Sequence, residues 1–279
     1  MAKNFVSNRP DLIEKLTRGV ASLGESKSWE QYLDFQGKFY DYSYKNTLLI
    51  LAQADHATQV AGFRTWEKLG RSVKKGEKAI WILAPMLYRD KTDSSVENQD
   101  KVLRGFKFVP VFDVSQTCGD PLPSICNPLY GDDPHDHFGR LVEVAAAIGF
   151  SVQDHDFQGT SNGDCTFELA RIRVEISNSP AQRVKTLVHE LSHAMLHKDE
   201  IARSLAELEA ESVAYVVCQV LGIDSSDYTF GYVATWAGGG SGAIESIRSS
   251  CHRIQTTASS ILEMMGSQGR IGEFSNKAA

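Results

Sequence analysis

The stretch from Thr186 to His197 reads TLVHELSHAMLH and places two histidines four residues apart, with a glutamate directly after the first. Residues four apart lie on one face of an α-helix, about one turn from each other, so His189 and His193 can direct two imidazoles at one ion. Zn²⁺ accepts such nitrogen ligands together with an oxygen ligand from elsewhere in the chain, and a catalytic site keeps one position for water. Glu190 is placed to act as general base toward that water.

The residues around this motif favour a metal site over two surface histidines on an ordinary helix. No proline interrupts the stretch after Pro180, and no charged residue follows Glu190 until Lys198. The surrounding positions are mostly apolar, namely Val188, Leu191, Ala194, Met195 and Leu196. A buried helix keeps polar groups when they have partners. The sequence therefore predicts a metal-binding helix, with Ser179 as its N-cap and Pro180 at its first position.

A second helix, expected from about 203 to 221, carries the acids from which a third ligand can come. Glu207 and Glu211 are four residues apart and share a face, so one of them is the expected ligand. Glu209 points away from both, and a solvated acidic helix face explains it well.

The remaining pattern predicts an α+β protein. Apolar residues at helical spacing predict further helices over 11–23, 28–38, 44–55, 137–149 and 243–265. Strand-like runs at 86–88 and 106–114 flank the polar residues 91–101, which indicates a hairpin with a flexible tip. A further strand is expected over 79–83, after a basic loop.

One strand is expected to serve the metal helix directly. Arg171, Arg173 and Glu175 alternate with Ile172, Val174 and Ile176, which is the period-2 pattern of a half-buried strand. We expect 172–176 to be an edge strand against which an extended peptide substrate pairs.

The chain of 279 residues is long enough for two domains. Residues 1–110 carry 18 Lys and Arg against 13 Asp and Glu, or +5, and the rest carries 11 against 22, or −11. Four of the eight prolines lie between 121 and 134, which is typical of a linker. We therefore expect a basic N-terminal domain at 1–117, a linker at 118–134 and a second domain at 135–279.

Composition bounds the environment of the protein. Five widely spaced cysteines, without a Cys-x-x-Cys pair, argue against a disulfide scaffold and against a thiolate zinc site. No apolar run reaches membrane-spanning length, and residues 1–24 lack the apolar centre of a secretory signal. We expect a cytoplasmic protein with no membrane partner.

Several dispersed segments of the N-terminal half resemble a known family. They are Tyr42-Ser-Tyr-Lys-Asn46, Val60-Ala-Gly-Phe-Arg-Thr-Trp66, Gly70-Arg-Ser-Val-Lys-Lys-Gly-Glu-Lys78 and Val111-Phe-Asp-Val-Ser-Gln-Thr117. These segments are similar to the N-terminal single-stranded-DNA-binding domain of ArdC-type antirestriction proteins, which are carried on plasmids and other mobile elements. The resemblance implies DNA contacts by Tyr44, Asn46, Trp66, Arg71, Lys74, Lys75 and Lys78.

Elementary physics supports the same kind of site. Single strands are bound by basic grooves that follow the phosphates and by aromatic rings on which bases stack. The residues just named, with Tyr40 and Tyr42, supply both kinds of group. Stacking requires exposure, and each aromatic taken alone fits a core position more readily. Lys74 and Lys75 are the stronger candidates.

The C-terminal half resembles the zinc metallopeptidase domain fused to ArdC, which is itself similar to the ImmA/IrrE peptidases. In glutamate-zincins the liganding acid is followed by the pattern x-x-small-acid, which here is Leu208-Glu209-Ala210-Glu211. The resemblance thus implies that Glu207 is the third zinc ligand. Glu211 is then placed to accept the N–H of a liganding histidine.

The predicted function is hydrolysis of a peptide bond in a protein substrate, such as a restriction or regulatory protein. Zn²⁺ is the expected cofactor and Glu190 the expected base. Tyr228 or Tyr232 is a candidate oxyanion donor, with core packing as the alternative. The alternative function is a DNA-binding antirestriction protein that cleaves nothing and whose zinc is structural.

Overall fold

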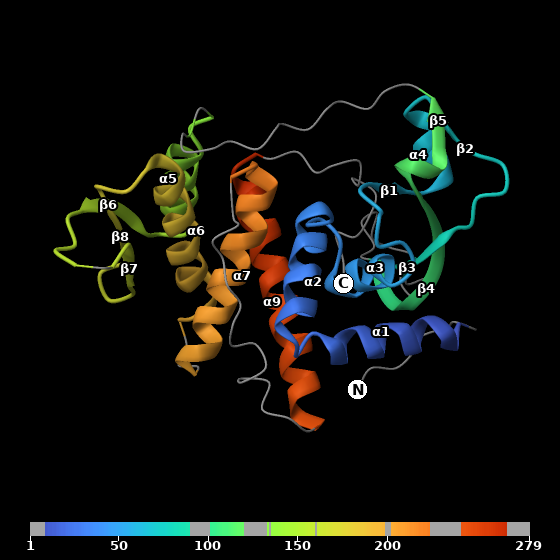
Figure 1. Ribbon diagram of the computed structural model, residues 1–279, viewed down its shortest axis with the longest axis horizontal. Coiled ribbons are helices and arrows are strands. Elements are labelled where there is room, and N and C mark those ends of the chain that lie inside the picture. Colours follow the sequence, from blue (N-terminus) through green and yellow to red (C-terminus); the bar gives the residue numbers. More distant parts are fainter. Residues whose placement is uncertain are drawn as a thin grey trace, which may run out of the picture. The chain divides into compact units, whose positions relative to one another are not determined.

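The computed structural model describes residues 9–89, 101–119, 133, 135–159, 161–198, 202–223 and 241–266. Their contacts divide the chain into two compact units, of which the first takes in 9–19 and 41–119 and the second 20–40 and 133–266 (Figure 1). Both units combine helices with small sheets, so the predicted α+β class is confirmed.

The first unit is built on an antiparallel sheet. Its strands are β1 (Val60–Ala61), β4 (Lys101–Asp113) and β3 (Ile80–Arg89), in that order, and β3 and β4 form the predicted hairpin. The expected tip, 91–101, lies outside the described residues except for its last position. A short pair joins β2 (Arg71–Val73) to β5 (Thr117–Gly119), beside the 3-10 turn Val114–Gln116.

Three helices complete this unit: α1 (Pro10–Ser22, up to Gly19), α3 (Tyr44–Leu51) and α4 (Phe63–Lys68). Leu12 of α1, Leu49 of α3 and Leu83 of β3 pack in one core cluster. The apolar spacing in α1 and α3 therefore predicts which face of each helix is buried. The residues expected as a basic loop begin with β2, because Arg71 to Val73 pair with Thr117 to Gly119.

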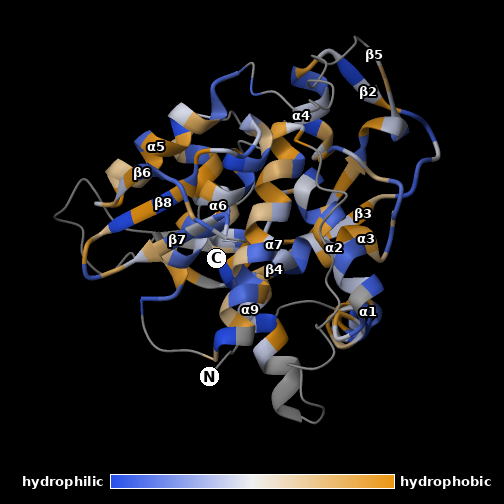
Figure 2. Cartoon of the chain, turned by 60° about the vertical axis from the view of Figure 1, so that its left-hand side comes forward, coloured by the Kyte–Doolittle hydropathy of each residue, from blue (hydrophilic) through white to orange (hydrophobic). Residues whose placement is uncertain are grey.

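The second unit combines helices with a mixed sheet. Its helices are α2 (Ser26–Lys38), α5 (His137–Ala147), α6 (Pro180–Leu196), α7 (Arg203–Leu221) and α9 (Ser241–Met264). Helices α2, α6 and α9 all pack against α7, whose C-terminal half is largely hydrophobic (Figure 2). The sheet contains β6 (Ser151–His155), β8 (Arg171–Glu175) and β7 (Gly163–Thr166), in that order.

The prediction that 172–176 form an edge strand is wrong. Residues 171–175 form β8 at the centre of this sheet, parallel to β6 and antiparallel to β7. Ile172 and Val174 are fully buried, as the alternation predicts. Alternation reports which face of a strand is covered and carries no information about its lateral neighbours. The edge strands are β6 and β7, and β7, whose short sequence Gly-Asp-Cys-Thr lacks a hydrophobic pattern, is the one that contacts α6.

Helix α2 belongs to the second unit. Trp29, Tyr32 and Leu33 have no exposed surface, and the Trp29 indole N–H donates to Ser212 Oγ on α7 at 3.1 Å. The hydroxyl of Tyr215, also on α7, donates to Asp34. The expected linker at 118–134 would assign α2 to the N-terminal domain, whereas these contacts are with α7. Of that expected linker, 120–132 and 134 lie outside the described residues.

Two further structural facts bear on the environment of the chain. No helix within the described ranges is long and apolar enough to cross a membrane. Among the cysteines in those ranges, Cys118, Cys165, Cys218 and Cys251 are free thiols, and Cys218 is buried in the core.

Trp29→Ala should destabilise the second unit by about 3–5 kcal/mol, because it leaves a large cavity between α2 and α7. Trp29→Phe should cost less, since it keeps most of the buried ring. Urea unfolding followed by far-UV circular dichroism measures both. Phe63→Ala is a matched control because Phe63 is 49% exposed. Equal midpoints for Trp29→Ala and this control would contradict the packing described.

Candidate metal centre

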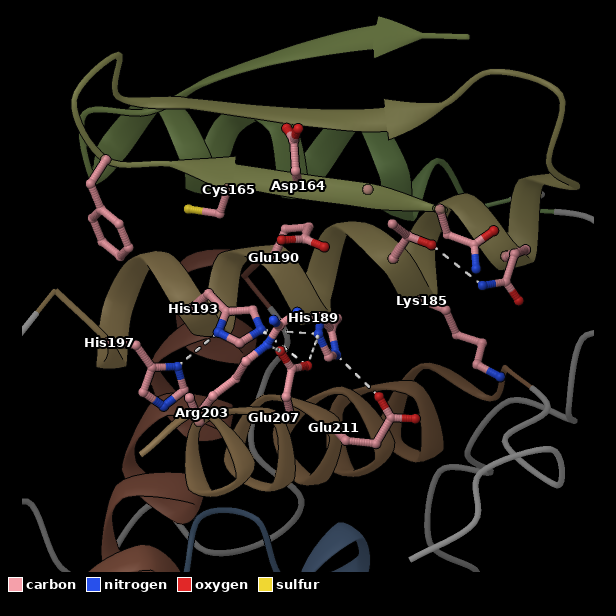
Figure 3. Close-up of a pocket in the computed structure, with 16 residues that line it drawn as sticks. Asp164, Cys165, Lys185, His189, Glu190, His193, His197, Arg203, Glu207 and Glu211 are labelled. Carbon is pink, nitrogen blue, oxygen red and sulfur yellow. Dashed lines mark hydrogen bonds and ion pairs between the residues drawn. The ribbon is translucent and has the colours of Figure 1, made fainter. Parts of the chain in front are cut away.

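Helix α6 presents the predicted motif. Ser179 Oγ accepts from the backbone N–H of Gln182, and Pro180 occupies the first turn, as predicted. One face of the helix is buried in the core through Val184, Leu187, Val188 and Leu191. His189 and His193 lie one turn apart on the side that faces α7 (Figure 3).

The structure brings together His189, His193 and Glu207. Their ligand atoms are separated by 3.1 Å between the two histidine Nε2 atoms, 3.5 Å from His189 to Glu207 Oε2 and 3.7 Å from His193 to the same oxygen. Two ligands of a tetrahedral zinc ion lie about 3.4 Å apart, given bond lengths of about 2.1 Å. The donor set and its spacing therefore fit a divalent ion, and within the described residues these three form a group close enough to hold one.

Glu211 contacts the other nitrogen of one histidine. Its Oε2 lies 3.1 Å from His189 Nδ1, on the side of the ring opposite the ligand nitrogen. A carboxylate there fixes the imidazole with its proton on Nδ1 and its lone pair on Nε2. Of the two acids left open by spacing, Glu207 thus faces both ligand nitrogens and Glu211 faces the back of one ring.

The electrostatics of the cluster are those of paired charges. Burial opposes the charged form of His189, but the hydrogen bonds that it donates to Glu207 and Glu211 outweigh burial and raise the pKa of His189 to about 10. The hydrogen bond from His189, with the imidazole of His193 close by, holds the pKa of Glu207 well below its usual range. Burial raises the pKa of Glu190, against the opposing effect of the two imidazoles.

A pocket of about 720 Å³ surrounds these groups. It is lined by α6, α7 and the edge strand β7, and Glu190 lies on the side of α6 that faces β7 (Figure 3). The strand comes close to the helix at Gly163, where an added Cβ would lie 2.6 Å from Thr186 Cγ2 and 3.1 Å from Glu190 Cγ. Glycine at this position therefore permits the close approach of strand and base.

His197 and Glu209, two polar residues beside the centre, have contacts that the local sequence does not predict. His197 Nδ1 lies 2.9 Å from His193 Nδ1, and His197 Nε2 lies 3.4 Å from Glu209 Oε2. Glu209 has no exposed surface, so its interpretation as part of a solvated face is wrong. The spacing of four between His193 and His197 is a signal for the first contact. The partners of Glu209 on α9, Ser250 and Arg253, are more than 40 residues away and give no local signal.

Most of the aromatic and amide groups predicted to contact DNA lie in the core. Asn46 is fully buried and bonds both backbone groups of Leu83, donating to its carbonyl at 2.9 Å and accepting from its N–H at 2.7 Å. Trp66 is fully buried and donates to the carbonyl of Phe112. Tyr44 is 8% exposed. Tyr40 and Tyr42 are buried as well. The structure thus gives these residues roles in folding and corrects their assignment as a stacking surface.

The basic residues of the predicted site are distributed differently. Lys74, Lys75 and Lys78 are exposed in the turn after β2, and the Lys74 ammonium donates to the carbonyl of Ser115. Arg71 donates to Thr117 Oγ1 and to backbone carbonyls of β5, so its guanidinium supports the β2–β5 pair. Phe63, within the motif that also contains Trp66, is the exposed aromatic that sequence reasoning does not single out. Tyr228 and Tyr232 lie outside the described residues.

Metal binding at this centre should strengthen as the pH rises. Because the pKa of His189 is raised to about 10, a proton must leave for each ion bound below that pH. The apparent affinity should therefore rise by about tenfold per pH unit from this group between pH 6 and 9. Competition with a chelating dye measures it.

Glu211→Gln is the control for this prediction. It removes a carboxylate that raises the pKa of His189, so the pH dependence should flatten at a lower pH. An affinity that is independent of pH in the parent protein would contradict the assignment.

The N-terminal part of the chain matches the model of a known family. The model of the N-terminal domain of anti-restriction factor ArdC matches residues 10–114. An uncharacterized protein of Bacillus anthracis is 28% identical over 272 residues, covering 82% of this chain and 46% of that protein. The chain thus spans about half the length of this curated relative.

Two crystal structures of the antirestriction protein ArdC from plasmid R388 share the fold. The metal-free structure matches with a TM-score of 0.52 and 20% identity, over 81% of this chain and 86% of that one. The Mn(II)-bound structure matches with a TM-score of 0.56 and 16% identity, over 92% of this chain and 99% of that one. Residues 10–114 therefore match the N-terminal domain of ArdC, and the fold of the chain is similar to that of R388 ArdC.

Proposed function

We propose that the second unit is a metal-dependent peptidase. The observation that carries the proposal is the spacing of the three ligand atoms of His189, His193 and Glu207, with the carboxyl of Glu190 in the same pocket. Two imidazoles and one carboxylate are the donors of several zinc hydrolases, and Zn²⁺ suits this set. The Mn(II)-bound structure of R388 ArdC supports a divalent ion in this fold.

The residues of the pocket divide the work of peptide hydrolysis. A bound divalent ion supplies Lewis acidity, which lowers the pKa of water and polarises a carbonyl. Glu190 takes a proton as general base and returns it to the leaving amine. Its burial, at 8% exposure, keeps the carboxyl away from bulk water. Glu211 keeps the proton of His189 on Nδ1, so that Nε2 remains a ligand.

The edge strand β7 is suited to hold the substrate. Among the described residues it pairs only with β8, and it lines the pocket next to Glu190. An extended polypeptide can add to such an edge through backbone hydrogen bonds, which hold a chain without regard to most of its side chains. The substrate class is thus an extended protein segment, such as a loop of a restriction or regulatory protein.

Glu190→Gln should abolish cleavage while leaving the metal bound. Loss of a general base lowers the rate by about 10²–10⁴-fold, and glutamine preserves the shape of the side chain. The measurement is the appearance of new protein N-termini in a cell lysate incubated with zinc-loaded protein, alongside elemental analysis of bound metal. His189→Ala is the companion variant, and it should lose the metal itself.

The alternative outcome identifies a different function. If the folded, metal-loaded parent produces no more new N-termini than Glu190→Gln does, the chain is a non-proteolytic protein with a structural metal site. A parent that binds no stoichiometric metal would overturn both.

We also propose that the first unit binds single-stranded DNA through α4 and the turn after β2. Residues 63–78 contain six Lys and Arg against two Glu, and most of these side chains are exposed. Phe63 stands on α4 at 49% exposure, with exposed Arg64 and Lys68 on the same helix. A strand bound here would place a base on Phe63 and its phosphates along the lysines. The ArdC N-terminal domain match covers the whole segment.

Phe63→Ala should weaken single-strand binding by about 1–3 kcal/mol, the usual value of one stacked base. The double variant Lys75→Ala/Lys78→Ala should weaken it and reduce the slope of log affinity against log salt by about 0.7 for each phosphate that is no longer neutralised. Fluorescence anisotropy with a labelled oligonucleotide measures both.

Ile13→Ala is the control for Phe63, because Ile13 is an exposed apolar residue at 41% exposure in the same unit. Lys198→Ala, in the other unit, is the control for charge. Binding that is insensitive to both test variants would move the DNA site elsewhere or remove it.

A further inference from the structure

A line of polar side chains runs from one ligand histidine into the core of the second unit. His193 Nδ1 lies 2.9 Å from His197 Nδ1, and His197 Nε2 lies 3.4 Å from Glu209 Oε2. The side chains of His193, His197 and Glu209 are 16%, 6% and 0% exposed, respectively. The line therefore starts at the pocket and ends where water does not reach.

The far end of this line is anchored on α9. Ser250 Oγ donates to Glu209 Oε1 at 2.6 Å, and Arg253 Nε donates to the same carboxylate at 2.9 and 3.1 Å. A guanidinium and a hydroxyl together compensate the buried charge. Glu209 is therefore held as a carboxylate, which can only accept hydrogen bonds.

An acceptor at this end fixes the protons along the line. Because Glu209 accepts, His197 must donate from Nε2, and a neutral His197 then offers a lone pair at Nδ1. His193 must donate its own Nδ1 proton to that lone pair. Its Nε2, which faces His189 Nε2 and Glu207, is left unprotonated, as a metal ligand requires.

We propose that His197 and Glu209 are positioning residues that hold His193 in the tautomer and orientation needed to bind the metal. The inference rests on the metal centre of the proposed function and adds to it. The two ligand histidines are thus held by different means. His189 contacts Glu211, which is 39% exposed, whereas His193 is held by a buried line of side chains that reaches α9.

The test compares two substitutions of His197. His197→Phe fills the same space and offers no acceptor, whereas His197→Asn keeps an acceptor oxygen near the position of Nδ1. Affinity for Zn²⁺, measured by competition with a chelating dye, should fall by about 10–100-fold in the phenylalanine variant. The asparagine variant should recover part of the loss. The visible absorption spectrum of Co²⁺-loaded protein should change in the phenylalanine variant, because it reports ligand geometry directly.

His56→Phe is the matched control, since the His56 side chain is 66% exposed and lies in the other unit. A folded His197→Phe protein with the Zn²⁺ affinity and Co²⁺ spectrum of the parent would overturn the proposal. Failure of the parent to bind either ion would instead overturn the proposed function, so the two failures are distinguishable.

A measurement on the unaltered protein decides between the tautomers if the variants do not fold. Long-range ¹H–¹⁵N correlation spectra of the zinc-loaded chain report which nitrogen of each histidine carries the proton. The expected pattern is Nδ1–H for His193 and Nε2–H for His197. A proton on Nδ1 of His197 contradicts the inference.

Discussion

Two carboxylates on α7 face two imidazoles on α6, and the polar chemistry of the second unit depends on this pairing. Each of these groups is costly to bury alone, but a protonated His189 between the two carboxylates satisfies part of their charge and hydrogen bonding. Apolar packing supplies the force that keeps them in place. Val188 and Leu191 on α6, and Val213 and Ala214 on α7, are fully buried beside the polar cluster. The candidate metal centre is thus a polar cluster between α6 and α7, and both helices are fixed by their buried apolar residues.

The pairing also explains how the site can exist before any ion arrives. Protonated His189 takes the place of a cation, because its two N–H groups face Glu207 and Glu211 respectively. An incoming ion replaces that proton and meets ligands that are already spaced for it. The site therefore needs little rearrangement to bind an ion. Because the two carboxylates stabilise the proton on His189, that proton competes with the ion for the imidazole.

Sequence predicts the parts of the structure that depend on local spacing. The metal helix, its cap at Ser179, the acidic helix 203–221 and the β3–β4 hairpin follow from residues that are near each other in the chain. What sequence could not predict depends on distant partners. Glu209 looks solvated until Arg253 is placed against it, and Trp66 resembles a stacking platform until Phe112 accepts its N–H. The choice between Trp66 and Phe63 is a choice of helix face. A helix of six residues, Phe63–Lys68, is too short for periodicity to settle it.

Helix α2 shows why a boundary drawn from sequence is insufficient for this chain. The ArdC N-terminal domain match begins at residue 10 and so includes α2, yet residues 20–40 belong to the unit that holds the metal centre. Trp29 and Asp34 contact Ser212 and Tyr215, which follow Glu211 on the same helix within about one turn. A helix that carries a ligand is only as well placed as the surfaces that pack against it. Helix α2, which lies within the family match, therefore helps to position α7, the helix that carries Glu207 and Glu211.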